Sequence, residues 1–418
     1  MRIAVIGAGI IGVSLAYFLR EDGHDVFVIE QNNGPALETS FANGGLLTPS
    51  LSDPWNSPGI LWRVLKYLGR QDTPILFRLN ALPSLGTWGL NFLKYSTKQH
   101  YFKNIEKNAT LGNLTNKLLK DLTQKTSLDF DFNPRGTLMI LRDKEELKEA
   151  SSLADFMSRL SVPYQVLNKQ ALIDKEPSLA PIQDELVAGI FYPDDASGDA
   201  NAFTRNLSRH LASHSVRFFY NATAKLVKAG SKVDILLGNE KLDVEAIVLC
   251  GGVQSPVIAK SLGIDLPIRP CKGYSLTLDC DTWSTMPQLP VIDHAFHMVA
   301  TPLGKRLRVA GTAEFAGFNK TLTASRVQNL VSILHKVFPQ GMANTDSAQI
   351  LPWTGLRPTC VDGVPLIGPS KYENLFINTG HGHLGWTMSL GSGKILADYF
   401  SGRPSEISLA DYSLTRFC

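Results

Sequence analysis

RIAVIGAGIIGVSLAYFLREDGHDVFVIE, residues 2–30, has the pattern of a strand, a helix and a second strand. The β-branched run at 2–7 and the apolar run at 25–30 predict the strands, and residues 10–20 have helical periodicity. A strand–helix–strand unit of this kind is typical of a Rossmann-type α/β sheet.

The turn between the first strand and the helix reads Gly7-Ala8-Gly9-Ile10-Ile11-Gly12 and matches G-x-G-x-x-G. Gly7 permits the tight turn, Gly9 lets a pyrophosphate approach the backbone, and Gly12 lets helix and strand pack closely. Glu30 ends the second strand, where its carboxylate can accept hydrogen bonds from ribose hydroxyls. We therefore expect a dinucleotide site at Gly7, Ala8, Gly9, Ile10, Ile11, Gly12, Glu30 and Gln31. The motif does not separate FAD from NAD, but its N-terminal position, with no second copy downstream, favours FAD as the only dinucleotide.

Length and composition predict a globular protein with two domains. The chain has 418 residues, of which 44% are apolar and 19% charged. We expect a mixed α/β protein, in which a Rossmann-type FAD-binding domain receives an inserted substrate domain of antiparallel sheet and helices. The predicted FAD-binding domain comprises residues 1–85, 175–265 and 340–418, and the substrate domain comprises 86–174 and 266–339.

The charge, cysteine content and apolar runs of the chain argue against several classes of partner and site. A net charge of +3 from 41 basic and 38 acidic residues argues against nucleic acid binding. The five cysteines are far apart and lack CxxC spacing, so we expect free thiols in a reducing, cytoplasmic compartment and no metal site. No apolar run reaches the roughly 18 residues of a membrane-spanning helix.

Periodicity predicts further elements along the chain. The segment 59–70 is a predicted helix in which Leu61, Leu65 and Leu68 share a face with Arg63, Lys66 and Arg70 around it. Such a helix could lie on an anionic membrane surface, on the inner face of the plasma membrane, or could simply face the core. The other predicted elements are helices at 104–126, 144–160 and 386–400, strands at 136–141, 246–249 and 374–378, and a hairpin of 232–237 with 241–244 around Gly238-Asn239.

Several motifs resemble those of one enzyme family. Glu38-Thr39-Ser40 with Asn43-Gly44, Pro54-Trp55, Lys272 to Leu276, Trp353 to Pro358, and Asn378 to Gly382 are similar to the bacterial D-amino acid dehydrogenase small subunit, within the D-amino acid oxidase and glycine oxidase superfamily. The resemblance covers nearly the whole chain. It implies FAD, oxidative deamination of a small D-amino acid, and transfer of electrons to a quinone or other membrane acceptor rather than directly to oxygen.

The resemblance also implies which loops surround the flavin. The loop after Glu38 is expected to wrap the pyrophosphate and the isoalloxazine ring. The glycine-rich turn 380–385 opens a helix, whose positive end suits the negative charge that develops on reduced flavin. The expected flavin contacts are Thr39, Ser40, Asn43, Gly44, Gly45, Gly251, Gly382, His383, Leu384, Gly385, Trp386 and Thr387.

Three residues are candidates for substrate contact. A guanidinium fork matches a planar carboxylate, and the resemblance implies that Arg357 stands at the position that binds the substrate carboxylate in the superfamily. Arg357 is therefore the expected clamp, with a loop-pinning surface arginine as the alternative. Tyr274 could offer its hydroxyl to that carboxylate or cap the pocket, or be a buried structural tyrosine. His383 could touch substrate. The competing interpretation is a histidine whose ring nitrogens form hydrogen bonds with the loop backbone.

Other positions are more ambiguous. Lys272 could face the flavin edge or pair with an acid, and His294 and His297 could line the pocket from a strand. The family usually has a small polar residue at the position of His383, an Ala-Gly-Gln-like run at residues 44–46, and a different pair at the two histidines. D-Alanine is therefore not assured as the preferred substrate.

The predicted activity is FAD-dependent oxidative deamination of D-amino acids, by hydride transfer from Cα to flavin N5. Oxidation of glycine, D-proline-like imino acids or opines is the alternative within the enzyme class. A nucleotide-binding structural or sensory protein without turnover is the alternative outside it.

Overall fold

The N-terminal unit forms the centre of a six-stranded sheet, in which β1 pairs in parallel with β2 on one side and β13 on the other. The computed structural model describes residues 1–67, 73, 75–78 and 81–417. All pairs in this sheet are parallel except the edge pair of β19 with β20. The order is β19 (Leu366–Pro369), β20 (Leu375–Thr379), β13 (Ala246–Leu249), β1 (Arg2–Ile6), β2 (Asp25–Ile29) and β9 (Arg217–Phe219).

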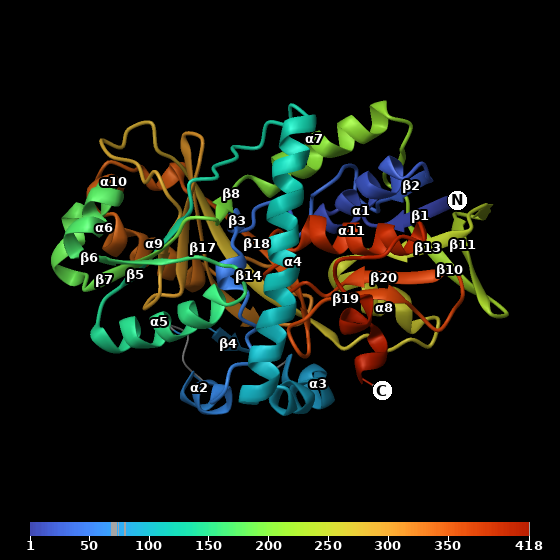
Figure 1. The fold of residues 1–418 in the computed structure, drawn as a ribbon, viewed down its shortest axis with the longest axis horizontal. Helices are drawn as coiled ribbons and strands as arrows, with labels where there is room; N and C mark the ends of the chain where they lie inside the picture. The colour runs from blue at the N-terminus through green and yellow to red at the C-terminus, as the bar shows by residue number, and fades with distance from the viewer. Residues whose placement is uncertain (68–72, 74, 79–80, 418) are drawn as a thin grey trace.

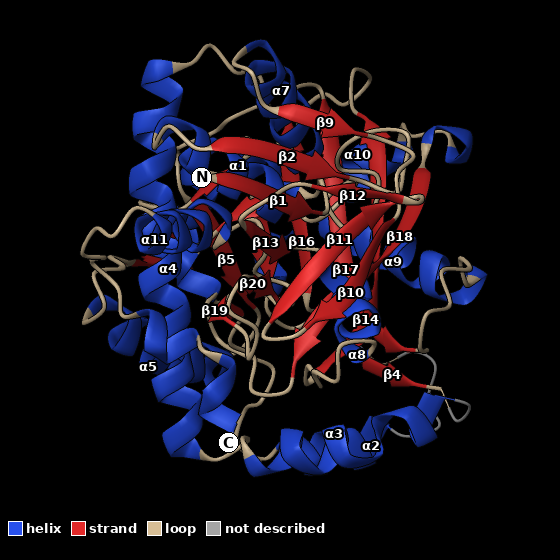
Figure 2. Cartoon of the chain, turned by 90° about the vertical axis from the view of Figure 1, so that its right-hand side faces the viewer, coloured by secondary structure: helices blue, strands red, loops and turns tan. Residues whose placement is uncertain are grey.

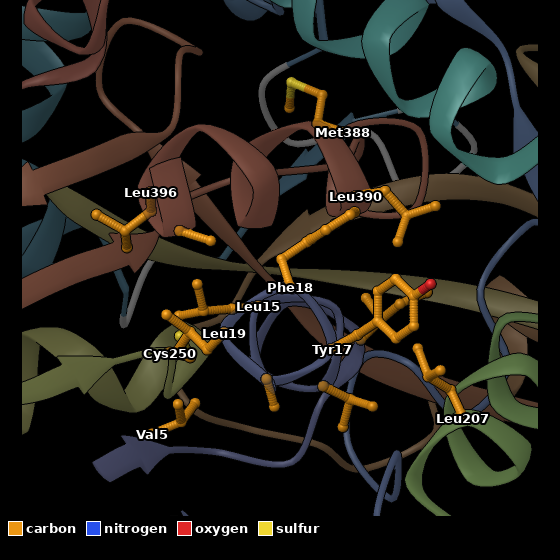
Figure 3. Close-up of a cluster of buried hydrophobic side chains, with 14 of the residues drawn as sticks. Val5, Leu15, Tyr17, Phe18, Leu19, Leu207, Cys250, Met388, Leu390 and Leu396 are labelled. Carbon is orange, nitrogen blue, oxygen red and sulfur yellow. The ribbon is translucent and has the colours of Figure 1, made fainter. Parts of the chain in front are cut away.

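Both faces of this sheet are covered, which explains why its strands are continuous apolar runs. One face carries α1 (Ile10–Glu21), α7 (Ala200–Ser213) and α11 (Ser389–Phe400). Figure 3 shows Phe18 of α1 directed toward α11, and Tyr17 toward Leu207 of α7. The other face carries α8 (Ser255–Lys260) and a small antiparallel sheet of β10 (Ala224–Ala229), β11 (Lys232–Leu237) and β12 (Glu240–Leu242).

A nine-stranded mixed sheet forms the other half of the molecule (Figure 1). It is mainly antiparallel, but β15 pairs in parallel with β5, and β17 with β4. Its order is β18 (Leu351–Cys360), β14 (Ile268–Asp279), β17 (Arg306–Phe315), β16 (Met298–Leu303), β15 (Val291–Asp293), β5 (Thr137–Leu141), β7 (Ala188–Tyr192) and β6 (Gln165–Asn168), with β4 (Ile75–Phe77) beside β17. A two-stranded pair, β3 (Leu46–Leu47) with β8 (Ala196–Ser197), completes the strands.

Helices surround the large sheet and connect it to the smaller one. The long helix α4 contacts α11, and a Cβ at Gly391 of α11 would meet the backbone of Leu111 at 2.5 Å. Figures 1 and 2 place α2 and α3 next to each other at one end of the molecule. The remaining helices are α2 (Ile60–Tyr67), α3 (Leu82–Lys94), α4 (Lys98–Lys125), α5 (Lys144–Ser158), α6 (Lys169–Lys175), α9 (Ala324–Val337) and α10 (Pro339–Ala343).

The predicted fold class is confirmed, and so are the predicted helices, strands and hairpin, with small shifts at their ends. The hairpin turn contains Gly238 at φ +62°, a conformation that suits glycine. Leu68, Arg70 and Cys418 lie outside the described residues; the other four cysteines are buried free thiols. The domain boundaries stay a prediction. β4, β7 and β18, which lie in ranges expected for the FAD-binding domain, pair within the large sheet.

Candidate functional site

The glycine turn has the conformation that a bound pyrophosphate needs. Gly7 has a φ of +111°, and a Cβ at Gly12 would overlap the carbonyl oxygen of Gly7. Gly9 is the N-cap of α1, and a Cβ there would meet only the Ser40 hydroxyl, at 3.5 Å. Gly7 and Gly12 are therefore required by the protein itself, whereas Gly9 leaves open space above the helix N-terminus.

Glu30 is held in place by backbone contacts from both of its neighbouring turns. Its Oε2 accepts a hydrogen bond from the Ala8 amide at 2.9 Å, and its Oε1 accepts from the Asn32 amide at 2.9 Å. Oε1 also accepts from the Asn32 side-chain amide at 2.8 Å, whereas Oε2 retains a lone pair, and the side chain lines a cavity. This geometry allows Glu30 to receive ribose hydroxyls.

One cavity of about 1280 Å³ runs from the glycine turn to the large sheet. This volume exceeds the roughly 300–1,000 Å³ of a typical small-molecule pocket. Of the predicted site residues, Ala8 and Gly12 do not line it, because they lie in the turn behind Gly7 and Gly9. Those that line it are Gly7, Gly9, Ile10, Ile11, Glu30, Gln31, Thr39, Ser40, Asn43, Gly44, Gly45, Gly251, Tyr274, Arg357, Gly382, His383, Leu384, Gly385, Trp386 and Thr387.

The loop 38–48 crosses the cavity and is tied to both halves of the molecule. Ser40 Oγ accepts from the amide of Ile10 in α1 at 3.1 Å. The Thr39 hydroxyl donates to the carbonyl of Leu356 in β18 at 2.6 Å. The predicted flavin loop is thus anchored at the boundary between the two large sheets.

The glycine-rich turn at 380–385 forms the opposite wall. The Gly382 amide donates to the carbonyl of Pro358 at 2.9 Å, which joins the turn to β18. His381 is buried, and burial lowers its pKa to about 3, so its ring is neutral at physiological pH. The His383 ring is exposed in the cavity that it lines, and desolvation by the surrounding protein, together with the Arg357 charge, also lowers its pKa to about 3.

Two buried polar side chains in this wall point to a bound polar group. Neither amide atom of Asn378 nor Nε2 of His381 has a hydrogen-bond partner among the described residues, although both side chains line the cavity. A buried amide without a partner is costly. The polar groups and the glycine cradle together fit FAD, whose pyrophosphate and ring offer donors and acceptors along this length.

Arg357 is the cavity side chain that most directly indicates the charge of a ligand. It projects from β18 across Gly273, where a Cβ would overlap its guanidinium. Its Nη1 donates to the Thr312 carbonyl at 3.4 Å, and no carboxylate forms an ion pair with it in the part of the chain that the structure describes. Burial lowers the pKa of Arg357, which nevertheless remains a cation. A half-buried cation of this kind, facing a cavity, favours an anionic ligand.

Thr312, which contacts Arg357, was not predicted from the sequence. The pairing of β14 with β17 shifts between Gly273 and Tyr274, and Thr312 is the extra, bulged residue with a φ of +58°. Its hydroxyl lines the cavity and has no partner within the described chain. Bulges often reorient groups beside active sites, but no local sequence signal marks this one.

The Tyr274 hydroxyl forms hydrogen bonds within the protein. It donates to Glu314 Oε2 at 2.5 Å and also lies 3.0 Å from the Thr323 hydroxyl; burial raises the pKa of Tyr274 to about 12. The structure therefore favours the capping and structural interpretations over a hydroxyl that binds carboxylate. Tyr274 still lines the cavity.

Lys272 pairs with the same carboxylate, which was one of its two predicted roles. Its Nζ lies 3.3 Å from Glu314 Oε2 and donates to the Thr321 carbonyl at 3.1 Å. Arg78 contacts the other oxygen of Glu314 at 2.6 Å. Lys272 does not line the cavity, so its pairing with an acid is the interpretation that the structure supports.

His294 and His297 line the cavity, but not from a strand, so that part of the prediction is wrong. They lie in the turn between β15 and β16, where His297 has a φ of +49°. A tight reversal after Asp293 displaces them from the sheet, because Asp293 accepts the Phe296 amide at 3.0 Å. Among the described residues no cluster of His, Cys, Asp and Glu has metal-binding geometry.

Trp55 completes the wall beside Arg357. Its indole stacks on the His383 imidazole with ring centroids 5.1 Å apart and planes at 12°. The Arg357 Cζ lies 5.7 Å from the indole centroid. Trp55 and Asn378 occur within the motifs that carried the family resemblance, which is the signal that could have marked both as site residues.

Comparison with known proteins places this geometry in context. Residues 2–399 match the family model described as "DAO: FAD dependent oxidoreductase". A D-amino acid dehydrogenase of Paramagnetospirillum magneticum is 40% identical, over 100% of this chain and 99% of that protein. One from Methylobacterium nodulans is 38% identical with the same coverage.

Solved structures share the fold at lower identity. Glycine oxidase from Geobacillus kaustophilus superposes with a TM-score of 0.78 at 21% identity, covering 99% of each chain. L-Proline dehydrogenase from P. horikoshii superposes with a TM-score of 0.79 at 18% identity, covering 100% of this chain and 97% of that one.

Proposed function

This chain belongs to the DAO family of FAD-dependent oxidoreductases, and we propose that it catalyses the oxidative deamination of D-amino acids. The resemblance inferred from its motifs is confirmed, and FAD is its cofactor. The relatives named D-amino acid dehydrogenase support the D-amino acid as substrate. Glycine, D-proline-like imino acids and opines remain the alternatives within the same chemistry.

The reaction requires binding and orientation more than acid–base catalysis. The glycine turn and Glu30 would hold FAD, which would supply the acceptor for the Cα hydrogen and its electron pair; water would then hydrolyse the resulting imino acid to a 2-oxo acid and ammonia. The protein must hold Cα in one orientation and exclude water from it. The neutral His381 and His383 are consistent with this, since neither is protonated at physiological pH.

The observation that carries the proposal is the half-buried guanidinium of Arg357, which lines the cavity. Its planar fork can bind an α-carboxylate through two parallel hydrogen bonds. Gly273 leaves the room that this side chain needs, and Thr312 orients it through one carbonyl contact. An amino acid bound there by its carboxylate is held beside the cavity that FAD fits.

Anaerobic titration of the purified protein tests this function. We expect D-amino acids to bleach the visible flavin band and L-amino acids to leave it unchanged. Glycine, D-proline and an opine are added in the same series, so that bleaching by one of these alone would redirect the substrate assignment. A flavin spectrum that no D-amino acid bleaches would contradict the proposal.

We further propose that electrons pass to a quinone or similar acceptor, with the protein on the cytoplasmic side of the plasma membrane and in peripheral contact with it. No helix within the described residues is long and apolar enough to cross a bilayer. However, Leu61 and Trp62 of α2 are 46% and 76% exposed, and Leu90 of α3 is 71% exposed. We call Leu61, Trp62, Leu90 and Leu93 the apolar patch.

The charge around the apolar patch matches an anionic lipid surface. From residue 54 to residue 98 the chain has six Lys or Arg residues and one Asp, whereas the whole chain has nearly balanced charge. The opposite side of α2 contributes Ile60 and Val64 to the cavity wall. A bilayer contact at α2 would therefore lie close to the site of electron transfer.

Replacing Trp62 and Leu90 together by serine is expected to weaken binding to phosphatidylglycerol-containing vesicles about tenfold or more, because both side chains would lose apolar burial in the lipid. Vesicle co-sedimentation measures this, with Val257→Ser, an exposed apolar residue on α8, as the matched control. Equal sedimentation of wild type and double variant would contradict membrane contact through this patch.

A further inference from the structure

The substrate side of the cavity contains an aromatic platform, formed by the stacked rings of Trp55 and His383. The two residues come from segments far apart in sequence and meet beside Arg357. Asp53, two residues before Trp55, lines the same cavity. Both rings line the cavity, so the platform is available to a ligand.

The wall beyond the platform continues with apolar side chains. Ile60 and Val64 come from α2, Ile75 from β4 and Trp353 from β18, and all of them line the same cavity. The neighbouring carboxylate of Glu314 does not line it and is engaged by Arg78, Lys272 and Tyr274. The platform therefore shares the cavity with several apolar side chains, which charged residues such as Asp53 and Lys148 also line.

The position of Arg357 sets where a substrate side chain can reach. A carboxylate oxygen in a charge-assisted hydrogen bond lies about 2.7–2.9 Å from the guanidinium nitrogens. The indole centroid is 5.7 Å from Arg357 Cζ, so the platform lies next to the group that would hold the substrate carboxylate. A methyl group would cover little of the two rings, whereas a large apolar side chain would remove much of their surface from water.

We propose that the Trp55–His383 platform is the side-chain subsite, and that it selects D-amino acids with large apolar or aromatic side chains over D-alanine and D-glutamate. This inference rests on the function proposed above. A charged side chain would lose hydration against the faces of the two rings. His383 thus acts through its neutral ring surface, as a specificity-determining residue.

Steady-state kinetics with an artificial dye acceptor tests the subsite directly. For the wild-type holoenzyme we expect kcat/KM for D-phenylalanine and D-leucine to exceed that for D-alanine and D-glutamate about tenfold or more. Equal or higher kcat/KM for D-alanine would overturn the subsite while leaving the deamination activity in place. Absence of turnover with every D-amino acid would instead contradict the proposed function.

Two variants assign the preference to the platform. His383→Ser and Trp55→Leu are each expected to lower the ratio of kcat/KM for D-phenylalanine to that for D-alanine at least about fivefold. His335→Ser, on the exposed face of α9, makes the same substitution as the first variant and should leave the ratio unchanged. The flavin absorbance per protein is measured for each variant. If His383→Ser loses FAD, Trp55→Leu decides the outcome, and an unchanged ratio in a flavin-loaded variant overturns the proposal.

Discussion

Replacing Arg357 by alanine is expected to lower kcat/KM for the best D-amino acid roughly 30- to 5,000-fold, the equivalent of about 2–5 kcal/mol. The substrate carboxylate would lose both hydrogen bonds of the guanidinium fork and would enter a cavity without a compensating cation. The variant should retain FAD, because Arg357 lies on β18, away from the glycine turn and Glu30. Steady-state kinetics and the flavin spectrum of the purified variant measure the two effects.

Two further arginine variants separate binding from general effects of charge. Arg357→Lys keeps the charge but not the planar fork, so it should recover only part of the activity. Arg205→Ala removes an exposed arginine from α7 and should leave kcat/KM unchanged. An unchanged kcat/KM in Arg357→Ala would remove this residue from the site.

Gly9→Ala is expected to lower the affinity for FAD about 100-fold or more, so that the protein purifies largely without flavin. The change should not disturb the protein itself. Gly9 has extended backbone angles that alanine adopts, and the added Cβ would meet only the Ser40 hydroxyl, at 3.5 Å. The lost affinity would therefore arise from the methyl group occupying the space of the pyrophosphate. Flavin absorbance and titration of the apoprotein with FAD measure it.

Other glycines provide the controls for this experiment. Gly86→Ala introduces a Cβ with no atom within 4 Å and should retain FAD. Gly12→Ala should destabilise the fold as well as the site, because its Cβ would overlap the Gly7 carbonyl. Full flavin content in Gly9→Ala would show that the pyrophosphate does not lie over this residue.

Elements that depend on neighbouring residues were predictable from the sequence. The first strand, helix and second strand, the Gly238 hairpin and the C-terminal helix all arise from local periodicity and turn chemistry. The helix predicted to begin at Trp386 starts at Ser389, because residues 386–388 form the turn that closes the cavity wall. The predicted end of a helix or strand is wrong where tertiary contacts hold its terminal residues in another conformation.

The same distinction between local and tertiary determinants applies to the candidate site. The cofactor cradle was predictable because Gly7, Gly9, Gly12 and Glu30 act within one strand–helix–strand unit. The engagement of Tyr274 by Glu314, and the turn that holds His294 and His297, were not, because they depend on strand pairing between distant segments. Sequence resemblance identified Arg357 as a candidate without showing what surrounds it.

The sequence alone determined the Rossmann unit, the dinucleotide cradle and the enzyme family, because each is encoded in short motifs whose physics is local. Only the tertiary structure decided that Arg357 is half-buried without a carboxylate partner among the described residues, that Thr312 is a bulged residue facing it, and that Trp55 stacks on His383. These three features join segments from both ends and the middle of the chain. They exist because packing of the two large sheets, rather than any local propensity, brings those side chains into one cavity.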